Sequence, residues 1–107
     1  GVRAAAAVAI GTSRQPTAAE VLRAAFAREP EPDVRRAVLF AAAGTRTAAA
    51  VDWLAGIVRD ADAAAAVDAI DALGTYRTDE AVRRRVGDAV AAREEPRLTA
   101  AFERAFA

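Results

Sequence analysis

The stretch VRRAVLFAAAGT, from Val34 to Thr45, decides the fold because the chain contains three versions of it. The other two are VRAAAAVAIGT, from Val2 to Thr12, and AAAVDAIDALGT, from Ala64 to Thr75. Each version is a short, Ala-rich apolar run that ends in Gly-Thr. The closing glycines recur at a nearly constant interval, at Gly11, Gly44 and Gly74.

A second series of apolar runs follows in the same phase. Three threonines at nearly the same interval open these runs: Thr17, Thr47 and Thr78. A period of about 31 residues with two helical segments per unit is typical of an α-solenoid. The sequence therefore predicts an all-α superhelix of about three helix pairs.

The ends of the predicted helices follow from local residue types. We expect Gly11, Gly44 and Gly74 to adopt a positive φ or to lie just past a helix end. Thr17 and Glu20 fit a capping box, and Thr47 and Thr78 are predicted N-caps. Seven helices follow, over residues 2–10, 17–28, 33–43, 47–59, 63–73, 78–93 and 97–106, with Asp33 or Glu31 starting the third.

The repeated pattern resembles the HEAT repeat, and most closely its short bacterial form, the phycobilisome-lyase-type HEAT-like repeat. Val2-Arg3 and Val34-Arg35-Arg36 match its Val-Arg start, Gly11, Gly44 and Gly74 match its closing Gly, and Asp33 and Asp62 match the Asp at the head of its first helix. Ala64-Ala65 departs from the Val-Arg start.

The resemblance implies a single repeat domain over 1–107, with units at about 1–30, 31–60 and 61–93 and a capping helix at 96–107. Because the chain begins with Gly in the middle of the pattern, we expect a fragment of a longer bacterial protein.

Composition excludes several classes of function. Fifteen Arg balance 15 acidic residues, so net charge gives no attraction to nucleic acid or to an anionic membrane. Charges interrupt every apolar run well before a membrane-spanning length. The chain has no His and no Cys, which removes the commonest catalytic bases, thiol nucleophiles and zinc ligands. We therefore expect a cytoplasmic protein that is not an enzyme and has no cofactor and no metal.

Two carboxylate pairs and one run of basic residues remain as candidate sites. Asp60 with Asp62, or Asp68 with Asp71, offers ligands for a divalent cation or a shared proton. The simpler interpretation is helix capping for the first pair and a solvated helix face for the second. The three arginines of Arg83-Arg84-Arg85 leave a helix about 100° apart and do not form one patch.

Three residues share an offset of six from the predicted Thr caps: Arg23, Trp53 and Arg84. If the repeats stack in that register, they form a column along the second helices, which line the concave face of HEAT-like arrays. Stacking and charge then suit an aromatic or acidic ligand. The alternative is that Trp53 covers a joint between repeats. Tyr76 is interpreted as a packing residue.

These observations lead to one functional hypothesis and one alternative. The hypothesis is a non-catalytic module that binds another protein or a peptide through its concave face, with Arg23, Trp53 and Arg84 as partner-binding residues. The alternative is a helical accessory domain of a larger enzyme, such as a phycobilisome-type lyase or the C-terminal domain of a peptidase.

Overall fold

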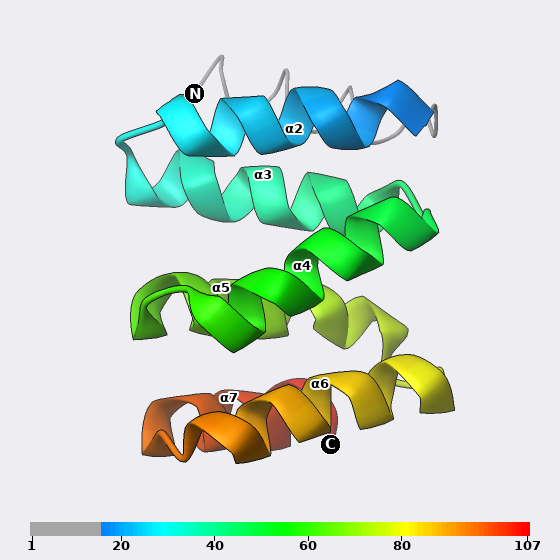
Figure 1. Cartoon of the computed structure of the whole chain (residues 1–107), viewed down its shortest axis with the longest axis vertical. Helices are drawn as coiled ribbons and strands as arrows, with labels where there is room; N and C mark the ends of the chain where they lie inside the picture. Colours follow the sequence, from blue (N-terminus) through cyan, green and yellow to red (C-terminus); the bar gives the residue numbers. More distant parts are fainter. Residues whose placement is uncertain (1–15) are drawn as a thin grey trace. The chain divides into compact units, whose positions relative to one another are not determined.

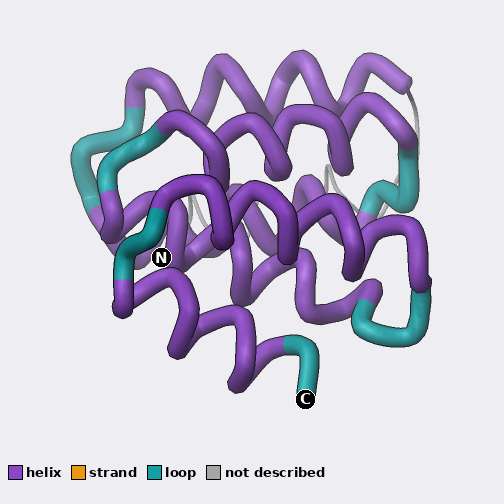
Figure 2. Tube along the Cα trace, turned by 60° about the horizontal axis from the view of Figure 1, so that its bottom comes forward, coloured by secondary structure: helices purple, strands orange, loops and turns teal. Residues whose placement is uncertain are grey.

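The computed structural model describes residues 16–107, and within that range the chain forms helices and turns without a strand. The predicted helix at residues 2–10 and Gly11 lie outside the described residues. The described α-helices are α2 (Pro16–Arg28), α3 (Pro32–Gly44), α4 (Ala48–Asp60), α5 (Ala63–Leu73), α6 (Glu80–Arg93) and α7 (Pro96–Ala105), with a 3₁₀ turn η1 (Gly74–Tyr76) after α5 (Figure 1). Short loops join them (Figure 2). The all-α class is confirmed for this part of the chain.

The chain divides into two compact units, Gly1–Val51 and Asp52–Ala107. The boundary falls within α4, in the first part of that helix. The division into three repeat units within one domain stays a prediction, as does the superhelix.

In the first unit, α2 packs against α3. Three large aliphatic side chains of these two helices are completely or almost completely buried: Leu22, Val38 and Leu39. The intervening loop contains Pro30 and leads to Pro32 at the first position of α3, where a missing backbone N–H costs nothing. Glu31 is the residue that precedes α3, so Glu31 rather than Asp33 starts this helix.

In the second unit, helices that are two apart along the chain run parallel. Arg85 of α6 pairs with Asp52 of α4, and Arg93 farther along α6 reaches Val58 farther along α4, at sequence separations of 33 and 35 residues. Arg104 near the end of α7 likewise pairs with Asp71 near the end of α5, again 33 residues apart.

Consecutive helices of this unit run antiparallel. Arg83 at the start of α6 donates a hydrogen bond to the carbonyl of Phe106, just after the end of α7. In Figure 1, α4 and α6 are in front and α5 and α7 lie behind them. The core between the two rows contains Leu54, Ile70, Leu73, Leu98 and Phe106, each with at most 2% of its surface exposed.

The closing glycines behave differently from the prediction of a left-handed conformation. No glycine in residues 16–107 has a positive φ. Gly44 is the last residue of α3, and Gly74 follows α5 directly with φ −59°. The prediction of a positive φ or a position just past a helix end is therefore confirmed at Gly74 by its position, and it is wrong at Gly44, which meets neither condition.

The threonine of each Gly-Thr pair closes the helix instead. Thr45 Oγ1 donates to the Ala42 carbonyl at 2.7 Å, and Thr75 Oγ1 donates to the Ala72 carbonyl at 3.1 Å. Both hydroxyls bind the carbonyl three residues earlier, among the last carbonyls of the helix, and the Ala42 carbonyl also accepts from the Thr45 backbone N–H at 3.1 Å. The left-handed residue after α3 is Arg46, with φ 57°.

One of the three predicted threonine N-caps is confirmed. Thr47 Oγ1 accepts a hydrogen bond from the Ala50 backbone N–H at 3.1 Å, at the start of α4. In contrast, α2 begins at Pro16, which places Thr17 inside its first turn. The N-cap of α6 is Asp79, whose carboxylate accepts hydrogen bonds from the N–H groups of Ala81 and Val82. Thr78 therefore lies outside that helix.

Candidate interaction surface

The α4–α6 seam of the second unit is the surface that the repeat pattern predicts for binding. We define it as the line of contact from Asp52 and Arg85 to Val58 and Arg93. At one end, Arg85 and Asp52 form an ion pair whose side chains are 46% and 63% exposed. An ion pair this exposed contributes only about 0–1 kcal/mol to the free energy of unfolding. It therefore indicates which parts of α4 and α6 are neighbours, but it stabilises their contact little.

The arginine run at the start of α6 sends its side chains in three directions, as the sequence predicts. Arg83 reaches α7, Arg85 reaches α4, and Arg84 is exposed to solvent. The partner of Arg85 is Asp52 from another helix, rather than a carboxylate of its own helix. Two of the three guanidinium groups thus tie α6 to its neighbours, and Arg84 presents its charge outward.

Trp53 is half-buried at the edge of the buried face of α4. Its neighbour Asp52 leaves the helix about 100° away. The buried face of α4 has two edges. Asp52 lies at one edge, beside Ala55, and Trp53 lies at the opposite edge, beside Ile57. Since Asp52 contacts α6, the edge that holds Trp53 is turned away from α6.

The register between α4 and α6 bears directly on the predicted column. The contacts between these two helices come at sequence separations of 33 and 35 residues, whereas the threonine offset matches Trp53 with Arg84 at a separation of 31. Trp53 is half-buried on α4 and Arg84 is exposed on α6, and their place in one column stays a prediction. Arg23 lies on α2 in the first unit, where it is exposed.

One carboxylate of each predicted pair, Asp60 or Asp71, binds an arginine. Asp71 is 15% exposed and pairs with Arg104 at 3.2 Å, so the predicted solvated face is wrong for this residue. Asp62 lies at the N-cap position of α5, although its side chain makes no capping hydrogen bond. No group of three acidic, His or Cys side chains suited to a metal ion occurs in residues 16–107.

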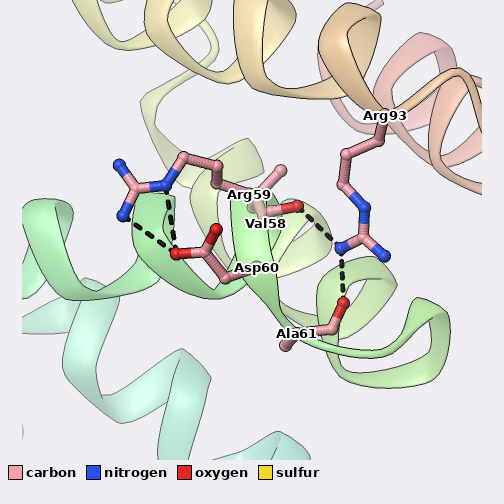
Figure 3. A network of polar contacts seen from close by, with 5 residues as sticks. All are labelled: Val58, Arg59, Asp60, Ala61 and Arg93. Atoms are coloured by element: carbon pink, nitrogen blue, oxygen red, sulfur yellow. Dashed lines mark hydrogen bonds and ion pairs between the residues drawn. The ribbon is translucent and has the colours of Figure 1, made fainter.

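Asp60 and Arg59 form an exposed pair beside the end of α4 (Figure 3). Arg59 Nε and Nη2 donate to Asp60 Oδ2 at 3.1 and 2.9 Å. This hydrogen bond lowers the pKa of the Asp60 carboxyl and raises the pKa of the Arg59 guanidinium. The chemistry of a cation site or a shared proton therefore finds no support at this pair.

Aromatic side chains are buried in η1 and stack with arginines in the first unit. Tyr76 is buried in η1, in agreement with its predicted packing role. In the first unit, the guanidinium of Arg35 stacks on Phe26 and that of Arg36 on Phe40, at 4.3 and 4.9 Å from the ring centroids. Phe40 is itself 36% exposed. The sequence places Arg35 and Arg36 at a repeat start but gives no sign of this stacking.

Comparison of the chain with protein-family models, with curated proteins and with solved structures finds no match. The resemblance to HEAT repeats thus rests on the sequence pattern. None of the helices in residues 16–107 combines the length and the apolar character that crossing a membrane requires.

Proposed function

We propose that the chain is a HEAT-like α-solenoid module without catalytic activity, which binds another protein or a peptide through the face of its second helices. The observation that supports this most directly is the parallel pairing of α4 with α6 and of α5 with α7, at sequence separations of 33 and 35 residues. A stack of helix pairs repeats its contacts at such a constant interval, and stacked repeats serve as extended binding surfaces.

The exposed residue types of α4 and α6 fit recognition better than chemistry. Arg84 presents an exposed cation, and Trp53 combines an aromatic surface with partial exposure. Arg and Trp are enriched among the residues that contribute most to protein interfaces. With no His and no Cys in the chain, the commonest side chains for acid–base and nucleophilic catalysis are missing.

Selection of peptides from a displayed random library against the immobilised protein tests this function. We expect binders whose affinity falls about tenfold or more in Arg84→Ala or Trp53→Ala, the range of an interface hot spot. Arg97→Ala is the matched control, because Arg97 is an exposed arginine of a different helix, α7. Binders that respond to Arg97→Ala but to neither Arg84→Ala nor Trp53→Ala would contradict the proposed surface.

The accessory-domain alternative makes a different prediction. If the module serves a larger enzyme, its strongest ligand is another part of the same polypeptide. A peptide array that covers the full-length gene product then yields a binding segment, and Arg84→Ala weakens that binding.

A further inference from the structure

Arg93, the last residue of α6, lies against the corner where α4 turns into α5. Its Nη1 donates a hydrogen bond to the Val58 carbonyl at 3.1 Å and another to the Ala61 carbonyl (Figure 3). Its Nη2 donates to Glu95 Oε1 at 2.9 Å. The side chain is only 16% exposed. One guanidinium thus joins the ends of two helices that are not neighbours along the chain.

The carbonyls that Arg93 binds are of the kind that a helix end leaves without partners. The last four carbonyls of an α-helix lack intrahelical donors and carry partial negative charge. A cation that donates hydrogen bonds to them is well matched, and charge-assisted hydrogen bonds are stronger than neutral ones. Arg93 therefore caps the C-terminus of α4 from a different helix.

Little else in its own sequence holds the corner in place. Of residues 59–62, Ala61 is half-buried and the other three are exposed. The Ala61 N–H donates to the Ile57 carbonyl at 3.0 Å, which continues the helical pattern by one residue. The described contacts within the corner are thus local, and those of Arg93 reach it from another helix.

Arg59 provides an internal comparison. It also lies in the last turn of its helix, but it is 65% exposed and binds the carboxylate of its sequence neighbour Asp60. This pair is formed within one turn and joins no second helix. Position at a helix end is therefore not what distinguishes Arg93.

We propose that Arg93 is a latch that couples two parts of the fold: the α4–α5 corner opens when the last turn of α6 detaches. In a stack of helix pairs, stability depends on contacts between neighbouring pairs as well as on each pair itself. Arg93 concentrates part of that coupling in one side chain. This inference concerns the second unit alone and does not depend on the proposed binding function.

Hydrogen exchange of the folded protein, followed by mass spectrometry on peptides covering residues 58–64, tests the latch. Arg93→Gln removes the cation and both of its hydrogen bonds to the corner, and we expect the corner to exchange at least about tenfold faster. Arg59→Gln is the matched control and should leave exchange there within about twofold. Unchanged exchange in Arg93→Gln, equal acceleration over all of residues 52–107, or the same acceleration in Arg59→Gln would each overturn the proposal.

A second substitution tests the coupling itself. Ala92→Gly weakens the last turn of α6 at an exposed position, because Gly is a poor helix former. With Arg93 present, we expect Ala92→Gly to accelerate exchange in the corner. In the Arg93→Gln background it should add nothing there, and an equal effect in both backgrounds would overturn the coupling. Should Arg93→Gln lose its helical circular dichroism, Arg93→Lys takes its place, because an ammonium keeps the charge but not the planar fork that spans both carbonyls.

Discussion

The two described Gly-Thr pairs end their helices by the same contact, a threonine hydroxyl on the carbonyl three residues earlier. The glycine beside each hydroxyl has a separate role. A Cβ built on Gly74 would lie 3.1 Å from the carbonyl oxygen and 3.2 Å from the Cβ of Ala105, whereas one built on Gly44 meets no described atom within 4 Å. A side chain at position 74 would therefore crowd the end of α7, whereas no described atom crowds one at position 44.

This difference gives opposite expectations for the same substitution. Gly74→Ala should lower the free energy of unfolding by about 1–3 kcal/mol, because the methyl group crowds the backbone of α7. Gly44→Ala should raise it by about 0.5–1 kcal/mol, since Ala favours the helix and restricts the unfolded chain. Thermal melts followed by circular dichroism measure both changes, and a shift of the same sign in the two variants would contradict this assignment.

Trp53 tests the boundary between packing and binding. Its half-buried position predicts that Trp53→Ala lowers the free energy of unfolding by about 1–2 kcal/mol, less than the roughly 3–5 kcal/mol of a fully buried aromatic residue. Leu54→Ala on the same helix is the reference, because Leu54 is completely buried and should cost about 2–5 kcal/mol. Urea unfolding of both variants ranks them. A loss for Trp53→Ala as large as that for Leu54→Ala would make Trp53 a core residue and remove the basis for its binding role.

At the scale of elements, the starts of the helices depend on which oxygen reaches the free N–H groups. The Asp79 carboxylate accepts hydrogen bonds from two of these groups, at 3.0 and 3.2 Å. Its negative charge also interacts favourably with the positive N-terminal end of the α6 dipole. We expect Asp79→Ala to lower the free energy of unfolding by about 0.5–2 kcal/mol.

Thr78→Ala is the control for the cap of α6, because Thr78 is exposed and precedes the cap. It should change the free energy of unfolding by no more than about 0.5 kcal/mol. Guanidinium denaturation of the two variants distinguishes the residues. A larger loss in Thr78→Ala than in Asp79→Ala would restore threonine as the N-cap.

At the scale of the whole molecule, α7 completes the core of the second unit. Leu98 and Phe106 are at most 2% exposed, while Arg97, Glu103 and Arg104 are exposed. One apolar face and one polar face are what a terminal capping helix requires.

Removal of residues 96–107 should therefore leave the second unit largely unfolded or molten. Burial of Leu98 and Phe106 alone accounts for about 3–6 kcal/mol, which is comparable to the total stability of a small domain. We expect lower helical circular dichroism and increased binding of a hydrophobic dye. Arg97→Ala, which removes an exposed side chain of the same helix, should change neither signal. A truncated chain that melts like the intact one would show that α7 is not a cap.

The sequence alone predicts most of the helices to within a few residues, because apolar spacing, prolines and charged breaks act locally. The ranges of α5 and α6 illustrate this, with predicted ends at Leu73 and Arg93 that the structure reproduces. The capping of α6 is not predicted, because Thr78 and Asp79 are both good cap residues and only the path of the backbone selects between them. The predicted column of Arg23, Trp53 and Arg84 depends on which residue caps α6, because Arg84 is chosen by its offset of six residues from Thr78.

What the sequence by itself determines here is therefore the helical class, the interval of the repeated Gly-Thr and Thr positions and the approximate ends of most helices, all of which follow from the spacing of residue types along one chain. Tertiary structure decides the register of α4 against α6, which a one-residue change of cap position rotates by about 100°. It also decides the partners of the arginines. A long, flexible guanidinium reaches whichever carboxylate or carbonyl packing brings near it, so Arg85 binds Asp52 and Arg93 binds the end of α4 although neither partner is near in sequence.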